Sequence, residues 1–200
     1  MLLATGAGQS DGGLVVPDRL YFTDSDEANE LIAADPLALL VGFALDQQVS
    51  VQKAFSGPLE LRRRLGTFDA DMLASTDLEP VFRQRPAIHR FPGSMARRVQ
   101  VLAEYLRERY DGDASHIWTD ASDAQELHAN LEALPGFGEM KIKSLAAVLA
   151  KRFRVKAAEG LVPSHPTLGD VDSPQALADY QAAKRAHKAE WRAARAGSAR

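Results

Sequence analysis

The chain contains no cysteine. This absence excludes disulfides, thiolate zinc sites, a cysteine nucleophile and any cysteine-ligated iron–sulfur cluster. Long hydrophobic runs are also missing, since no stretch reaches the roughly 18 uninterrupted apolar residues of a membrane-spanning helix. The N-terminus has no basic region ahead of an extended apolar one, as a signal peptide would have. We therefore expect a soluble, cytoplasmic protein with no membrane partner.

Several catalytic signatures are absent as well. The five histidines are dispersed along the chain, and none belongs to a His-Glu-x-x-His or comparable metal-ligand spacing. The sequence has neither a Walker loop nor a Gly-x-Ser-x-Gly elbow. It therefore gives no support for metal-dependent hydrolysis, nucleotide hydrolysis or serine hydrolase chemistry.

The charges that are present are segregated along the chain. The 200 residues have a formal net charge of -3, with 46% apolar and 26% charged residues, as expected for one globular domain or two closely packed lobes. The acidic residues near the beginning are Asp11, Asp18, Asp24, Asp26, Glu27, Glu30 and Asp35, and the basic residues near the end are Lys184, Arg185, Lys188, Arg192, Arg195 and Arg200. This distribution favours contact between a polyanion and the later part of the chain, with a solvated helix face as the alternative.

Helical patterns dominate, so the predicted fold class is all-α. The expected helices cover 24–34, 35–45, 57–65, 69–75, 77–84, 94–110, 122–133 and 139–153, with a loop over 157–171 and a further helix from 172 onwards. Only Leu14–Val16 and Arg19–Phe22 have the pattern of extended segments. We divide the chain into an acidic N-terminal arm (1–23), a helical domain (24–180) and a basic C-terminal helix or tail (181–200).

The most specific local feature is Leu134-Pro-Gly-Phe-Gly138, which joins a helical pattern ending near Ala133 to another beginning near Glu139. Two glycines one residue apart permit a tight backbone path and the close approach of a ligand. The exposed amides of the following helix can then face a phosphate, with Lys141 and Lys143 nearby as cations. The alternative is a plain turn between helices with solvated lysines, and the spacing alone does not separate these interpretations.

Two upstream segments accompany this motif. The first, Leu40-Val-Gly-Phe-Ala-Leu-Asp-Gln-Gln-Val-Ser-Val-Gln-Lys-Ala54, is an apolar helix that ends abruptly in a polar turn before a Lys-Ala helix start. The second, Phe91-Pro-Gly-Ser-Met-Ala-Arg-Arg-Val-Gln-Val-Leu-Ala-Glu-Tyr105, leads from a Gly turn into a helix. In this order the three segments resemble the HhH-GPD superfamily of base-excision DNA repair glycosylases, over roughly residues 35–153. The resemblance implies a small bacterial member with a two-lobed helical DNA glycosylase fold and a helix-hairpin-helix at about 122–153.

The resemblance also implies contacts with double-stranded DNA. In the family, the turn after the early helix lies beside the extruded base and helps to fill the gap in the duplex. A Gln offers donors and acceptors, and a small apolar neighbour can enter an opened base step, which makes Gln48 and Val49 candidates for this role. The alternative for Gln48 is a helix-terminal side chain that caps its own backbone. The remaining expected DNA contacts are Ser50, Lys53, Arg97, Gly136, Gly138, Lys141 and Lys143.

No cofactor is expected apart from one ion that the family holds at its hairpin. Hairpins of the family bind a monovalent cation through backbone carbonyls, and this cation bridges to a DNA phosphate. The matching carbonyls in this chain belong to Glu132, Leu134 and Phe137. Because backbone oxygens supply the bonds, the side chains do not test this expectation.

Two departures from the family pattern bear on catalysis. Members that also cut the DNA strand have a lysine two positions after the second hairpin glycine, where it forms a Schiff base with the sugar. That place holds Met140, for which packing and base contact are the two interpretations, and Lys141 sits about 100° further round the helix. The resemblance therefore favours a monofunctional glycosylase, with Lys141 used for phosphate binding.

The second departure concerns the catalytic aspartate of the family, which stabilises positive charge on the sugar as the base departs. The usual offset from the lysine position falls on Ala158. A loop about twelve residues longer than usual, counted from the family spacing, would bring Asp170 or Asp172 into place. Asp170 precedes the predicted helix and is expected to point into a cleft, whereas Asp172 or Ser173 suits the helix N-cap.

These observations leave three hypotheses. The first is a monomeric DNA glycosylase, a hydrolase that flips a damaged or mismatched base and cleaves its N-glycosidic bond in base excision repair. The second is a non-catalytic helix-hairpin-helix module that has kept DNA binding and lost the chemistry. The third is a structural or interaction protein that retains the fold without DNA contact. For the first two we expect a nucleoid-associated bacterial protein.

Overall fold

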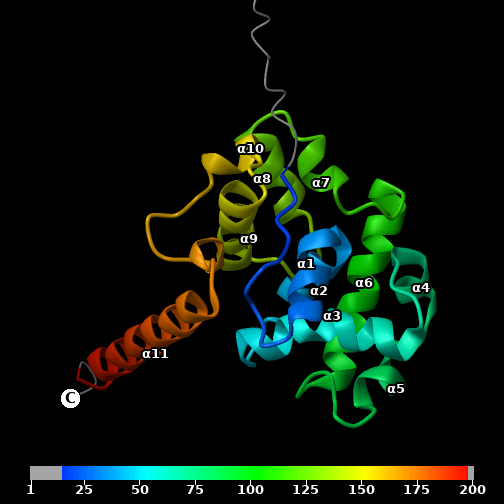
Figure 1. Cartoon of the computed structure of the whole chain (residues 1–200), viewed down its shortest axis with the longest axis horizontal. Helices are drawn as coiled ribbons and strands as arrows, with labels where there is room; N and C mark the ends of the chain where they lie inside the picture. The colour runs from blue at the N-terminus through cyan, green and yellow to red at the C-terminus, as the bar shows by residue number, and fades with distance from the viewer. Residues whose placement is uncertain (1–14, 198–200) are drawn as a thin grey trace, which may run out of the picture.

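The computed structural model describes residues 15–197, with side-chain environments as far as residue 186. Within that range every regular element is helical, which confirms the all-α class (Figure 1). The elements are α1 (Asp26–Ala34), α2 (Pro36–Leu45), α3 (Val51–Leu65), α4 (Ala70–Ser75), α5 (Leu78–Arg83), α6 (Pro92–Tyr110), α7 (His116–Thr119), α8 (Ala124–Glu132), α9 (Glu139–Arg152), α10 (Lys156–Glu159), the 3-10 turn η1 (Leu168–Asp170) and α11 (Pro174–Gly197).

The helix α2 is the centre of the core. Asp35 caps it, accepting hydrogen bonds from the amides of Leu37 and Ala38 at 2.9 and 3.2 Å, and Pro36 occupies its first turn. Every residue from Leu37 to Leu45 is buried, in keeping with a helix that is apolar all round. Among the helices that the structure describes, no single one is both long and apolar enough to cross a bilayer.

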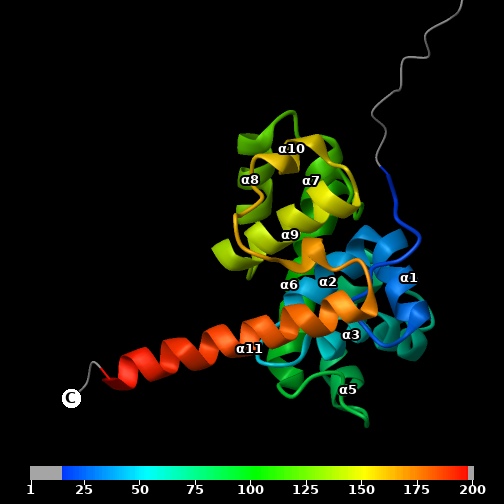
Figure 2. The same cartoon turned by 60° about the vertical axis from the view of Figure 1, so that its left-hand side comes forward.

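The helices pack in two groups that share one continuous apolar core. The helices α1 to α6 contact one another, and α7 to α10 contact one another, with η1 packed against α9 and α11 (Figure 2). Buried side chains from both groups belong to the same cluster. The hairpin between α8 and α9 lies in the second group.

The start of α3 and two short helices differ from the sequence prediction. The helix α3 begins at Val51, six residues before the expected start at 57, because the Ser50 hydroxyl caps it and accepts a hydrogen bond from the Lys53 amide at 3.2 Å. The short helices α7 and α10 were not expected. Each has four residues, too few for a periodic pattern to predict.

The N-terminal segment is part of the body where the structure describes it. Leu20 and Phe22 are completely buried in the core. Residues 19–22 form no strand, because the Leu20 amide and its neighbours bond locally rather than to a second extended segment. The boundary expected at residue 23 is therefore wrong for the described residues. Residues 1–14, the rest of the expected arm, lie outside the described range, and so does Leu14, the first residue of the other predicted extended segment.

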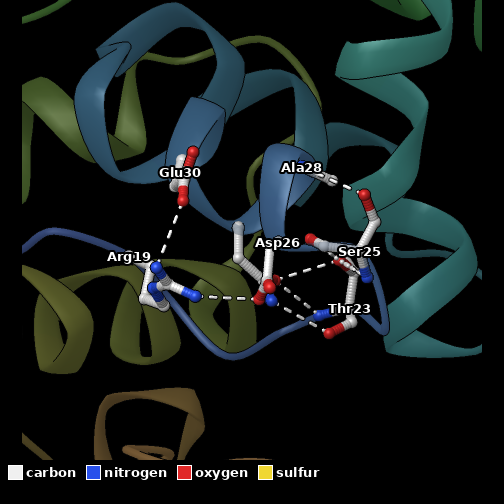
Figure 3. A network of polar contacts seen from close by, with 7 residues as sticks. Arg19, Thr23, Ser25, Asp26, Ala28 and Glu30 are labelled. Atoms are coloured by element: carbon white, nitrogen blue, oxygen red, sulfur yellow. Dashed lines mark hydrogen bonds and ion pairs between the residues drawn. The ribbon is translucent and has the colours of Figure 1, made fainter.

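Polar contacts fix this segment to α1 (Figure 3). The Thr23 amide and hydroxyl both donate to the Asn29 side-chain oxygen, at 2.9 and 3.0 Å, and the Asn29 amide group returns a 3.0 Å bond to the Thr23 carbonyl. Arg19 pairs with Asp26 at 2.8 Å and with Glu30 at 3.2 Å (Figure 3). Part of the acidic cluster at the beginning is therefore paired inside the fold.

The helix α11 runs without a break through the expected boundary at residue 180. Gln181 is bonded to Gln52 of α3, at 2.6 Å in one direction and 3.5 Å in the other. Beyond this contact α11 extends away from the rest of the chain, as Figure 1 and Figure 2 both show. The side chains of Lys188, Arg192, Arg195 and Arg200 lie outside the described residues, so contact of this tail with a polyanion stays a prediction.

Candidate functional site

The loop between α8 and α9 is a tight turn with one open end. Its Phe137 amide donates to the Leu134 carbonyl at 3.1 Å, and both side chains are buried. Gly136 has a φ of +78°, a left-handed conformation that favours glycine. Gly138 caps α9 without any side-chain hydrogen bond, and a Cβ built on it would meet nothing within 4 Å. No side chain therefore caps the first amides of α9, and an uncapped helix start is suited to binding an anion.

Arg98 of α6 completes this turn. Its Nη1 donates to the Gly136 carbonyl at 3.4 Å, and a Cβ on Gly136 would lie 3.1 Å from the same nitrogen. Arg97, the residue expected to contact DNA, is 68% exposed and has Glu104 as its nearest acid, at 3.9 Å. One residue is a step of about 100° round a helix, so neighbouring arginines face different ways. The sequence prediction named Arg97 as a DNA contact and missed Arg98, the arginine that lies at the hairpin.

Lys141 turns inward from α9 rather than out towards solvent. Its Nζ donates to the Ala44 carbonyl at the end of α2, at 3.2 Å, and lies 5.7 Å from the centroid of the Phe137 ring. The pKa of Lys141 is lowered to about 8, chiefly by burial and then by the charge of Arg98, while Asp46 opposes the shift. This contact brings the first turn of α9 against the end of α2, and it differs from the simple phosphate contact expected for Lys141.

Glu139 and Met140, the first two residues of α9, are exposed. Lys143 pairs with Glu139 at 2.9 Å, and His128 lies 3.6 Å from the same carboxylate. The hydrogen bond from Lys143 lowers the pKa of Glu139, its charge adds to this effect, and burial opposes it. Met140 is 70% exposed, so of its two interpretations packing is not seen. An apolar side chain therefore projects into solvent beside the hairpin.

The turn between α2 and α3 presents Gln48 outward. Gln48 has a φ of 57° and is exposed, and its side chain makes no hydrogen bond within the described part of the chain. Capping of its own backbone is thus not seen. Val49 packs against the core, and Ser50 is used as the cap of α3. Lys53, an expected DNA contact, donates to the Ala87 carbonyl at 2.7 Å and so holds the neighbouring loop.

A shallow pocket of about 280 Å³ separates this turn from α11. The turn contributes Asp46, Val49 and Ser50 to its lining, and α11 contributes Gln181, Lys184 and Arg185. Burial raises the pKa of Asp46, and the charges of Lys184 and Lys141 offset part of this rise. Among residues 15–186 the Asp46 carboxylate has no hydrogen bond or ion pair, whereas its backbone amide ends α2. The sequence analysis did not single out Asp46 as a site residue.

The neighbouring Gln47 and His89 have unpaired polar atoms below the turn. Gln47 Oε1 and His89 Nε2 are both buried without a hydrogen-bond partner in the part of the chain that the structure describes. His89 Nδ1 accepts a hydrogen bond from the Phe91 amide at 3.1 Å. Burial lowers the pKa of His89, against the effect of the Leu45 and Gln47 carbonyls, so the imidazole is neutral at pH 7.

Asp170 does not lie in this pocket or at the hairpin. Its carboxylate pairs with Lys151 at 2.5 Å and accepts hydrogen bonds from the amide and hydroxyl of Thr167 at 2.9 and 3.2 Å, in the capping box of η1. Burial raises the pKa of Asp170, but these partners outweigh it and the net shift is downward. Lys151 is thirteen residues along α9 from Gly138, a rise of about 20 Å. The cleft-facing position expected for Asp170 is thus not found.

Asp172 is exposed and lies just before α11. The cap of that helix is Ser173, whose hydroxyl accepts a hydrogen bond from the Ala176 amide at 3.2 Å. Of the two residues that suited the N-cap, Ser173 therefore takes the position. Asp172 makes no hydrogen bond or ion pair with the described residues.

The carbonyls expected to hold a cation are at the hairpin turn. The Leu134 carbonyl already accepts a hydrogen bond from the Phe137 amide, at 3.1 Å. The carbonyls of Glu132 and Phe137 accept no hydrogen bond from the described residues. No group of three or more His, Asp or Glu side chains in residues 15–186 is arranged to hold a metal. The backbone cation site stays a prediction, because it uses no side chains.

Comparison of the chain with protein-family models, with curated proteins and with solved structures gives no match. The resemblance to the HhH-GPD superfamily therefore rests on the three sequence segments alone.

Proposed function

We propose that this chain binds double-stranded DNA through the α8–α9 hairpin and acts as a monofunctional DNA glycosylase in base excision repair. The observation that carries the proposal is the open first turn of α9 at Gly138, placed against the polar turn that follows α2. The Lys141 bond to the Ala44 carbonyl joins these two elements. An anion-binding helix end and an outward-pointing Gln48 thus lie on adjoining elements.

The two elements suit two different tasks on a duplex. The free amides of α9 would bind a backbone phosphate, whose contact fixes the position of the protein without reading sequence. Gln48 would enter the space left by an extruded nucleotide, because it is exposed, has no partner and can pair with either base edge. The proposed fold is the two-lobed helical glycosylase arrangement, which the packing of the helices in two groups supports. We also propose a monovalent cation at the hairpin carbonyls.

Hydrolysis without strand cleavage is proposed because of Met140 and Lys141. Met140 stands at the position of the lyase lysine and has no nucleophile. Lys141 is directed towards the Ala44 carbonyl rather than outward. Water would therefore displace the base, and the DNA strand would stay intact.

Base release is the direct test. Purified protein is incubated with duplexes carrying alkylated, oxidised, deaminated or mismatched bases, and both free base and strand breaks are measured. We expect free base from at least one duplex class and strand breaks only after alkaline treatment. DNA binding with no base release from any of these duplexes would reject catalysis, and enzyme-dependent strand cleavage would reject the monofunctional assignment.

The alternative is a non-catalytic DNA-binding module with the same hairpin. The observation that favours it is the position of Asp170, whose carboxylate is bound to Lys151 and Thr167 about 20 Å along α9 from the hairpin. Salt titration of DNA binding separates both functions from a protein without DNA contact. Affinity for a plain duplex should fall steeply as salt rises if phosphates are bound.

A further inference from the structure

The pocket between the α2–α3 turn and α11 has one carboxylate in its lining, that of Asp46. Half-buried acids elsewhere in the described chain are already used by the fold. Asp35, for example, accepts hydrogen bonds from two amides at the start of α2. Asp46 has no such partner among residues 15–186, although burial of an unpaired carboxylate costs free energy. A half-buried, unpaired carboxylate in the lining of a pocket marks a place where a ligand can pair with it.

We propose that Asp46 is the catalytic carboxylate of the glycosylase reaction, and that it faces the sugar of the extruded nucleotide in this pocket. This inference rests on the proposed function. At about 280 Å³ the pocket is slightly smaller than the usual ligand site, which has about 300–1,000 Å³. It therefore has room for no more than one nucleotide.

The charges around the pocket match a nucleotide. Lys184 and Arg185 of α11 line it opposite Asp46, so a phosphate can bind at α11 while the sugar lies over the carboxylate. Lys141 of α9, which donates to the Ala44 carbonyl at the end of α2, adds a further positive charge near Asp46. The charges of Lys184 and Lys141 favour the ionised form of Asp46, while burial acts in the opposite direction and raises its pKa.

The carboxylate has a defined task in the reaction. The bond between C1′ of the sugar and the base nitrogen breaks, its electron pair leaves with the base, and positive charge develops on the sugar ring. A carboxylate facing the ring stabilises that charge. Water then adds its oxygen to C1′, and its proton passes to Asp46 and on to the departing base, so that Asp46 ends the cycle ionised.

The test uses a probe that carries no base. The full chain is titrated with a duplex containing a cationic pyrrolidine abasic nucleotide and with one containing the neutral tetrahydrofuran nucleotide of the same shape. We expect the wild type to prefer the cationic duplex by at least about tenfold, the factor that corresponds to about 1.4 kcal/mol. Asp46→Asn should bind the two duplexes equally. Asp71→Asn, the same change at an exposed site on α4, should keep the preference.

The outcomes separate the aspartates. Loss of the preference in Asp46→Asn, with Asp170→Asn unchanged, supports the proposal. Equal binding of the two duplexes by the wild type overturns it, and so does loss of the preference in Asp170→Asn while Asp46→Asn retains it. The abasic probe has no base to release, so its binding is measured independently of the base-release assay. A negative base-release assay rejects the proposed glycosylase function, whereas the probe titration decides the position of the carboxylate.

A measurement on the wild type alone covers the case in which Asp46→Asn does not fold. The preference should decrease as the pH falls, because protonation removes the charge of Asp46 while the pyrrolidine stays cationic. The other charged groups around Asp46 are Lys141, Lys184 and Arg185, which stay protonated as the pH falls. His89 gains a positive charge over the same range, which further decreases the preference for the cationic duplex. A preference that stays constant or increases down to pH 4 overturns the proposal.

Discussion

Replacement of Gly138 by aspartate tests the anion site at the hairpin more sharply than removal of a lysine. The site has a φ of -99° and a ψ of 171°, the extended conformation of an N-cap, so any residue can adopt it. A Cβ there meets nothing within 4 Å. Aspartate and asparagine are both preferred caps and differ by one charge, which makes Gly138→Asn the matched control for Gly138→Asp.

The two variants should fold as well as the wild type and bind DNA differently. A capping side chain in place of glycine adds a few tenths of a kcal/mol to helix stability. A new negative charge about 6 Å from a phosphate costs between about 0.7 and about 3 kcal/mol, for effective dielectric constants of about 80 and about 20. The affinity of Gly138→Asp for a plain duplex should therefore be about threefold to a hundredfold below that of Gly138→Asn.

Fluorescence anisotropy with a labelled duplex, at several salt concentrations, measures this difference. The difference in affinity between Gly138→Asp and Gly138→Asn should decrease as the salt concentration rises, since salt screens the repulsion between the aspartate and the phosphate. Thermal melts of both variants confirm that the fold is kept. If Gly138→Asp and Gly138→Asn bind the duplex with equal affinity at low salt, no phosphate lies at the start of α9 and the reasoning is refuted.

Three other changes test how the site is held. Gly169→Ala places a Cβ 2.4 Å from the Ala147 carbonyl oxygen, and such overpacking should cost about 1–3 kcal/mol, seen as a fall of several degrees in the melting temperature. Lys141→Met tests the lowered pKa of Lys141. Between about pH 8 and 10.5 the unfolded chain binds more protons than the folded chain. Urea melts should therefore show that the wild type gains stability relative to the variant as the pH rises through that range. Asp170→Asn breaks the partly exposed pair with Lys151 and should cost up to about 1 kcal/mol at pH 7. Because the pKa of Asp170 is lowered in the folded state, this difference should vanish as the pH falls through it; an equal loss at pH 7 and at pH 2 would contradict the ion pair.

The helices and the hairpin turn were predictable because local sequence determines them. The Pro-Gly-x-Gly pattern predicted a tight backbone path, and Gly136 adopts a left-handed conformation there. Capping residues such as Asp35 marked helix starts within one or two positions. The segment around Leu20 was predicted less well, since its burial depends on contacts with α1 and the core that no local pattern encodes.

The candidate site was predictable only in part. The turn carrying Gln48 was found from its abrupt change in polarity, whereas the position of Asp170 was not, because an ion pair with Lys151 on a distant turn of α9 decides it. Asp46 was missed since a polar residue at a helix end is ordinary in sequence. The pocket that Asp46 lines forms only when the α2–α3 turn and α11, which are far apart in the chain, come together.

The close contact at Gly169 has a mechanical consequence. The backbone of η1 lies against the backbone of α9 there, so close that no side chain fits between them. Since η1 also contacts α11, which forms one wall of the pocket, packed contacts connect α9 with the pocket wall. We therefore expect a rotation of α9 about its axis to move α11 and so to change the width of the pocket.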